Sequence, residues 1–106
     1  MGRNRNKNRG KWFERKVAKF LGGERYPADS GGRSDVFTDE LEAQCKYVKD
    51  MSHRELTDLA QEMQHHKKGK HGFVVHQIPP GQGKQTPMLI TMTAEVFLAW
   101  QERRNL

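Results

Sequence analysis

Cysteine is almost absent from this chain of 106 residues, which carries a single thiol, that of Cys45. One cysteine excludes an intrachain disulfide and a cysteine-ligated zinc site, and it fits a reducing setting. Long apolar runs are absent as well, because no segment approaches the ~20 apolar residues that a membrane-spanning helix needs. No secretory signal is visible, since the basic N-terminal segment is not followed by an apolar stretch. We therefore expect an intracellular protein without a membrane partner.

Hydrophobic residues are scarce, at 34% of the chain, so we expect one domain with a thin core. Charge is unbalanced, because 19 Lys and Arg residues stand against 13 Asp and Glu residues. The excess gives a pI of about 9.7 and indicates a polyanionic partner, nucleic acid before a membrane surface. The alternative is a basic protein whose charge serves only solubility.

Residues 1–11 form a basic segment that has no apolar residue after Met1 and therefore cannot contribute to a core. We expect a flexible N-terminal arm over residues 1–11 and a single domain over residues 12–106. The arm either contacts phosphates or is a solvated tail. Its basic residues are Arg3, Arg5, Lys7, Arg9 and Lys11.

The spacing of apolar residues predicts alternating helices and strands after this arm. A short extended piece is expected after Gly23, and a capping box at Ser52 and Glu55 marks the start of the second helix. The order helix, three strands, helix, two strands, helix predicts an α/β or α+β domain with a mixed central sheet flanked by helices. The expected helices cover residues 12–21, 53–66 and 93–104, and the expected strands cover residues 35–37, 41–47, 72–78 and 88–93. The side chains expected to point inward from the first and last helices are those of Phe13, Val17, Phe20, Leu21, Val96, Phe97 and Trp100.

The segment DVFTDELEAQCKYV, residues 35–48, alternates in a way that is typical of a strand with two different faces. Glu42, Gln44 and Lys46 share one face, and the intervening apolar residues and Cys45 share the other. If residues 38–41 form a hairpin loop, Asp35 stands across from Gln44. We expect Cys45 to be a packed thiol and not a nucleophile.

An acid on one strand beside an oxygen-bearing residue and a lysine on the next supplies the parts of a phosphodiesterase site. Mg²⁺ binds oxygen ligands, usually one or two carboxylates together with several waters. A lysine beside the ion orients water and neutralises phosphate charge. Spacing alone is weak evidence, because the solvated faces of strands carry the same residue types.

Four segments, taken in order, give the chain a resemblance to a known superfamily. The segments are RGKWFERKVAKFLGG, DSGGRSDV, LEAQCKYVKD and GFVVHQIPPGQGKQTPMLITMTAEVFLAW. The chain resembles the PD-(D/E)xK nucleases and, within them, the small Holliday junction resolvases of the archaeal and phage type. The resemblance implies a restriction-endonuclease-like fold, Mg²⁺ (or Mn²⁺ in its place), a homodimer, and the cytoplasm of a bacterial or archaeal host.

The resemblance also implies roles for individual residues. Glu14 corresponds to the acid on the first helix, Asp35 to the motif aspartate, Gln44 to the middle ligand and Lys46 to the motif lysine. Asp35, Gln44 and Glu14 would hold the metal ion, and Glu42 is a further candidate ligand. The residues expected to contact DNA are Arg3, Arg5, Lys7, Arg9, Lys11, Ser30, Arg33 and Lys84.

Two positions depart from the motif of the superfamily. Ser34 stands where proline is usual, which is a small change. Gln44 stands where glutamate or aspartate is usual, so one negative charge is missing, although a glutamine variant is known in one restriction-enzyme branch. Glu42, about 6.6 Å along the same strand face, either supplies that charge or only lines the groove.

The sequence therefore predicts a metal-dependent DNA endonuclease, with branched DNA as the first choice of substrate. Two alternatives stay open: a nuclease of the same fold that acts on another DNA structure, and a DNA- or RNA-binding protein without catalytic activity. His65, His66 and His71 are expected to be solvated basic surface instead of a metal site. Trp12 and Trp100 are expected to pack or to lie in a dimer contact, in preference to stacking on bases.

Overall fold

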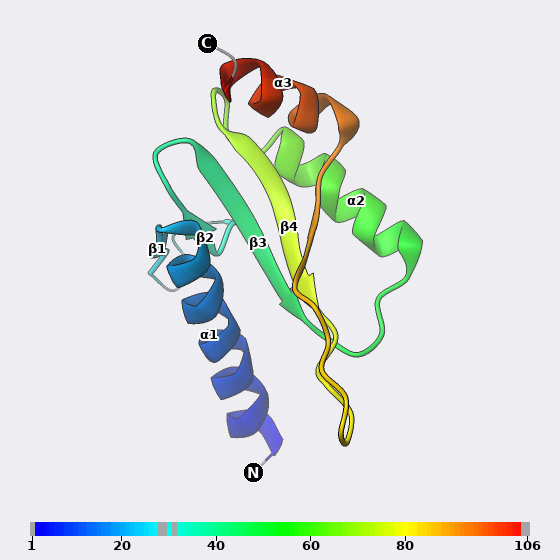
Figure 1. Ribbon diagram of the computed structural model, residues 1–106. Coiled ribbons are helices and arrows are strands. Elements are labelled where there is room, and N and C mark those ends of the chain that lie inside the picture. The colour runs from blue at the N-terminus through cyan, green and yellow to red at the C-terminus, as the bar shows by residue number, and fades with distance from the viewer. Residues whose placement is uncertain (1, 28–29, 31, 105–106) are drawn as a thin grey trace.

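The computed structural model describes residues 2–27, 30 and 32–104, and for residues 2–8 and 104 it describes the backbone alone. The chain forms an α+β domain with a five-stranded mixed sheet and three helices in the predicted order (Figure 1). The elements are α1 (Gly2–Leu21), β1 (Glu24–Arg25), β2 (Val36–Phe37), β3 (Leu41–Tyr47), α2 (His53–Gln64), β4 (His71–Gln77), β5 (Leu89–Thr91) and α3 (Ala94–Arg104).

The strands lie side by side in chain order, β1-β2-β3-β4-β5. Every neighbouring pair is antiparallel except β3 and β4, which are parallel and are joined through α2. Parallel neighbours need such a crossover, because the chain must return to the starting edge before the second strand begins. The predicted mixed sheet flanked by helices is confirmed.

The two faces of the sheet carry separate apolar clusters. On one face, Phe13 and Val17 of α1 pack against Ala43 and Val75, and all four side chains are buried. On the other face, α2 packs its Met63 and Ala60 against Val74 of β4. The alternation of β3 therefore points Ala43 and Cys45 toward α1, and Glu42 and Gln44 toward the α2 face. Figure 1 shows α1 and α2 on opposite sides of the central strands.

The first helix is longer than the sequence predicted. It begins at Gly2, so the expected arm has a helical backbone that runs directly into the core helix. Arg, Lys and Asn are compatible with a helix once an apolar turn nucleates it, and this explains how the basic segment continues α1. The helix ends as expected at Gly22, which has a φ of 70°. The amides of Gly22 and Gly23 bond back to the carbonyls of Lys19 and Ala18, the pattern of a Schellman cap.

Two residues predicted to point inward are exposed. Phe20 is 65% exposed because it lies near the end of α1, where it lines an open apolar cleft of about 240 Å³ between α1, the strands and α3. Phe97 is exposed because α3 contacts the rest of the domain through a narrow face. Among the described residues of α3, only Val96 is buried. No helix in the described part of the chain is long and apolar enough to cross a membrane.

Candidate active site

Asp35 lies where β2 begins and directly across from Gln44, as the hairpin prediction requires. The register pairs Val36 with Ala43 and Phe37 with Glu42, and the Asp35 amide donates to the Ala43 carbonyl at 2.8 Å. The Asp35 carboxylate accepts a further hydrogen bond through Oδ2 from the Cys45 amide, also at 2.8 Å. The side chain is therefore fixed against the end of β3 by a backbone donor.

The surroundings of Asp35 raise the pKa of its carboxyl above the ordinary value. Partial burial raises the pKa of Asp35, the bond from the Cys45 amide lowers it, and the negative charge of Glu14 raises it again. The positive charges of Lys46 and Arg25 lower the pKa of the same carboxyl. The fold thus brings Glu14, Asp35 and Lys46 within electrostatic range of one another, although they come from α1, β2 and β3.

Glu14 is held by a residue that the sequence did not single out. Arg25 of β1 contacts Glu14 Oε1 with Nε and with Nη2, both at 3.1 Å. Both side chains are about a quarter to a third exposed, so the pair lies at the edge of the packed face. A two-residue strand carrying one arginine gives no sequence signal for this contact.

Lys46 opens onto a groove of about 910 Å³ between α1, the end of β3 and the loop that joins β4 to β5. In Figure 1 this loop extends beyond the sheet, at the same end of the molecule as the start of α1. Four cations line the groove together with Glu14, so its charge suits a polyanion. The lining residues are Arg9, Gly10, Phe13, Glu14, Cys45, Lys46, Tyr47, Val48, Lys49, Ile78, Pro79, Pro80, Gly81, Lys84 and Thr86.

Gln44 is buried, with 7% of its surface exposed, and it points to the α2 face beside Val74. Its Oε1 atom is buried without a hydrogen-bond partner among the residues that the structure describes. Leaving a buried amide oxygen unpaired costs about 1–3 kcal/mol, so the atom requires a partner such as water or a cation.

Glu42 occupies a different place from the one predicted. Its side chain is fully buried, and both carboxylate oxygens accept from the Tyr26 hydroxyl at 2.8 Å. Lys70 Nζ lies 3.1 Å from Oε2, and Lys67 Nζ lies 4.0 Å from Oε1. These contacts fix Glu42 in an internal network, which corrects the expectation that it adds charge to a metal site or lines the groove.

The two carboxylates that would be available to a magnesium ion are those of Asp35 and Glu14. The described residues contain no group of three or more His, Cys, Asp or Glu side chains suited to a metal. Mg²⁺ needs fewer, since one or two carboxylates usually suffice. Asp35 and Glu14 each use one oxygen in the contacts above, and the unpaired Gln44 oxygen is a neutral donor.

The residues predicted to contact DNA divide into those at the groove and those elsewhere. Arg9 lines the groove with its guanidinium 5.3 Å from the centre of the Tyr47 ring, and the exposed Lys84 lines it from the loop. Arg33 lies apart, 3.5 Å from Glu62 of α2, and Ser30 bonds to the Pro27 carbonyl at 2.8 Å. Lys11 is an exposed residue of α1, and the side chains of Arg3, Arg5 and Lys7 lie outside the described ones. Lys49, which also lines the groove, was missed because it follows the motif strand in a loop.

Cys45 is the packed thiol that the sequence predicted. It is partly buried against the apolar cluster below α1. Burial raises the pKa of this thiol well above its ordinary value, and the charges of Asp35 and Glu14 raise it further. The thiol therefore stays protonated at neutral pH and is a poor nucleophile.

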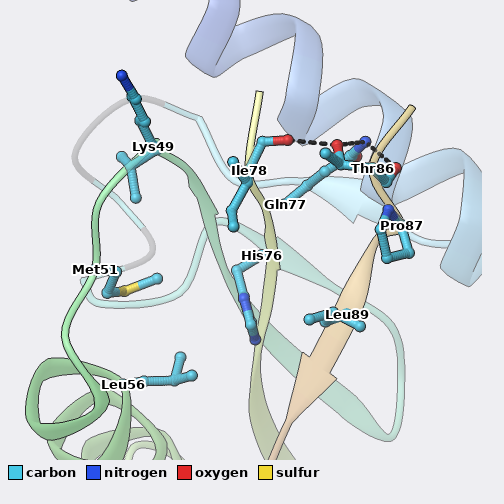
Figure 2. A pocket seen from close by; sticks show the side chains of 10 residues that line it. Lys49, Met51, Leu56, His76, Gln77, Ile78, Thr86, Pro87 and Leu89 are labelled. Atoms are coloured by element: carbon cyan, nitrogen blue, oxygen red, sulfur yellow. Dashed lines mark hydrogen bonds between the residues drawn. The ribbon is translucent and has the colours of Figure 1, made fainter. Parts of the chain in front are cut away.

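A smaller cavity of about 210 Å³ lies on the α2 side of the loop between β4 and β5 (Figure 2). His76 points into it between Leu56 and Leu89, while Lys49 extends away from it. The His76 ring lies 2.7 Å from the Thr91 hydroxyl, and burial lowers the pKa of the imidazole. Its lining contains no acid, so it lacks the carboxylates on which the chemistry above depends.

Comparisons of the chain with protein-family models, with curated proteins and with solved structures find no match.

Proposed function

We propose that the protein is a metal-dependent DNA endonuclease that acts on branched DNA, in the manner of the small Holliday junction resolvases. The observation that carries this proposal is that Asp35 lies within electrostatic range of both Glu14 and Lys46, and that the last two line a basic groove. A strand face that only contacts water would not require an acid from a helix to lie near an aspartate and a lysine of the sheet.

The topology of the sheet supports the same proposal. The element order and the single parallel pair, β3 with β4, agree with the restriction-endonuclease-like core that the sequence resemblance implies. In this arrangement Asp35 immediately precedes β2, and Lys46 lies near the end of β3.

Mg²⁺ would be held by Asp35 and Glu14 with Gln44 as a neutral ligand, and Mn²⁺ would substitute for it. Such an ion neutralises charge on the phosphodiester and lowers the pKa of bound water. The protein supplies the rest. The Cys45 amide fixes the orientation of Asp35, and Arg25 fixes that of Glu14. The Lys46 ammonium neutralises the phosphate that lies against the groove wall.

Binding relies on the remaining cations of the groove. Arg9, Lys49 and Lys84 border it from α1, from the end of β3 and from the loop. Contacts of this kind follow the phosphate backbone and carry no sequence information, which suits a protein that recognises DNA shape. A four-way junction has near-twofold symmetry, so we propose a homodimer that presents two sites.

A second candidate, a protein that binds nucleic acid without cutting it, is favoured by one observation. Gln44 brings no negative charge, and the nearest acid on its strand face, Glu42, is already paired with Lys70 and Tyr26. The cluster therefore has one carboxylate fewer than the superfamily motif. Such a protein would keep the groove and the fold while binding the ion weakly.

The two candidates are separated by incubating the protein with a labelled four-way junction, a flap, a nicked duplex and an intact duplex. Each substrate is tested with Mg²⁺, with Mn²⁺ and with EDTA. The nuclease proposal expects cleavage of the junction in either metal and none in EDTA. Binding of every substrate without cleavage in either metal would refute it and favour the second candidate, and cleavage of the flap or nick alone would refute the junction as the substrate.

A further inference from the structure

An aromatic cluster extends from Phe13 and Tyr47, which line the basic groove, to Trp12, which lies beside Tyr47 outside that lining. Trp12 is 47% exposed although the residue next to it, Phe13, is fully buried. The Trp12 ring meets the edge of the Tyr47 ring with the centroids 5.4 Å apart, and Tyr47 stacks on Phe13 at 5.1 Å. The cluster is therefore anchored in the core at Phe13 and opens to solvent at Trp12.

Cations are interleaved with these rings. The Arg9 guanidinium lies 5.3 Å from the centre of the Tyr47 ring, and Lys16 Nζ lies 5.3 Å from the centre of the Trp12 ring. Lys16 also donates to Gln77 Oε1 at 3.2 Å, which directs the ammonium toward the end of β4. The half-buried Tyr47 ring and the exposed Trp12 ring thus each have a positive charge beside them.

The opposite wall of the groove is apolar but exposed. Ile78 is 54% exposed and lies on the loop after β4, followed by Pro79 and Pro80, which also line the groove. Duplex DNA offers a protein mainly its phosphates and the edges of its bases, and its stacked bases do not present a flat face to an exposed ring. An unpaired base does, since each base has a flat apolar face that stacks on an aromatic ring whatever its sequence.

We propose that this groove binds a single-stranded DNA segment, with Trp12 as the stacking surface for an unpaired base and Arg9 and Lys16 as its neighbouring phosphate contacts. The proposal rests on the proposed function to the extent that the same groove receives the DNA. It narrows the substrate class to branched or flapped DNA that exposes unpaired bases at the branch point.

The test compares a ligand with bases to one without, in EDTA, so that no cleavage interferes. The ligands are a short oligothymidylate and an inorganic polyphosphate of similar charge. The variants are Trp12→Ala and Trp12→Phe, with binding measured by fluorescence polarisation of labelled oligothymidylate and by competition with polyphosphate. Trp100→Phe, which leaves Trp12 as the only tryptophan, reports stacking through quenching of its fluorescence.

We expect Trp12→Ala to weaken oligothymidylate binding about 10-fold or more while polyphosphate binding changes little, because one stacked base contributes this much. Trp12→Phe should retain most of the affinity, and oligothymidylate should quench Trp12 saturably. Equal weakening for both ligands, or no quenching on binding, would overturn the proposal. Circular dichroism of each variant checks that α1 is intact.

The failures of the two proposals are distinguishable. Junction cleavage in Mg²⁺ without quenching by oligothymidylate overturns the stacking surface and leaves the nuclease standing. Quenching and base-dependent binding without cleavage in either metal supports the stacking surface and refutes the nuclease.

Discussion

At the scale of single residues, the candidate site depends on how the fold treats negative charge. Asp35 and Glu14 lie near enough to affect each other, and each is restrained by one donor, the Cys45 amide and Arg25 respectively. Because Gln44 stands where the superfamily motif has an acid, the cluster carries one negative charge fewer. The carboxylates then repel each other less when no cation is present, and they would attract a divalent ion more weakly.

The substitution Gln44→Glu tests this balance. It adds one negative charge at nearly constant side-chain shape. A Mg²⁺ ion bound beside Asp35 would attract this new carboxylate by a few kcal/mol at an effective dielectric of ~20. We expect the variant to need about 10-fold less Mg²⁺ for half-maximal junction cleavage and to be less stable without metal. Glu42→Gln is the comparison, and because Glu42 lies in the internal network it should lower stability without changing the magnesium requirement. An unchanged requirement in Gln44→Glu would show that Gln44 does not face the ion.

Cys45 reports the same cluster independently of activity. Negative charges nearby raise the pKa of a thiol, so removing one lowers it and increases the thiolate fraction at a given pH. We expect Glu14→Gln to speed alkylation of Cys45 by iodoacetamide severalfold at pH ~8 in EDTA. Glu24→Gln, a change at an exposed acid of β1, is the control and should leave the rate unchanged. Equal rates in Glu14→Gln and the wild type would place Glu14 too far from Cys45 for the cluster to exist.

The sequence predicted some of these residues and missed others for a physical reason. Asp35 and Gln44 are nine residues apart across one tight hairpin, so the assumption of a loop over residues 38–41 was enough to place them opposite each other. The partners of Glu42 are Tyr26 and Lys70, which are 16 and 28 residues away and are brought together only by the assembled sheet. Local periodicity carries no information about such contacts, and the same holds for Arg25 and Glu14.

At the scale of elements, the β3–α2–β4 unit sets the position of Lys46 and of the groove. The Ser52 cap was visible in the sequence, and the Ser52 hydroxyl accepts from the Glu55 amide at 3.0 Å. The extension of α1 to Gly2 could not be predicted from the sequence. A basic segment without an apolar stripe does not distinguish a flexible arm from a helix. The exposure of Phe20 and Phe97 likewise depends on where the sheet ends beneath each helix.

The contact of β4 with α2 leaves no space for a side chain at Gly72. A Cβ atom there would lie 1.9 Å from the backbone oxygen of Met63, so the helix would have to move. We expect Gly72→Ala to lower the free energy of unfolding by about 1–3 kcal/mol, measured by urea denaturation. The matched control is Gly81→Ala, where an added Cβ meets nothing within 4 Å, and it should change stability by less than about 0.5 kcal/mol. Equal stability of the two variants would mean that α2 does not pack on β4 in this way.

At the scale of the whole molecule, part of the net charge of +6 gathers at one groove. Arg9, Lys46, Lys49 and Lys84 line this groove together with Glu14, and the helical basic segment of α1 continues from the same end. Binding to DNA should therefore fall steeply with salt whatever the activity, because each phosphate contact releases counterions. Binding alone cannot test the nuclease proposal, because a protein that only binds DNA would show the same salt dependence. The decisive measurement is the rate of DNA cleavage.

That measurement is the single-turnover rate of junction cleavage by Lys46→Ala, at saturating protein in Mg²⁺, with binding to the same junction measured in EDTA. Lys49→Ala, which removes a cation from the same groove outside the cluster, is the matched control. We predict that Lys46→Ala lowers the rate by on the order of 10²-fold or more, while both variants bind the junction with similarly small losses. Cleavage by Lys46→Ala at the wild-type rate, or equal losses of rate in both variants, would contradict the assignment of Glu14, Asp35 and Lys46 as the active site.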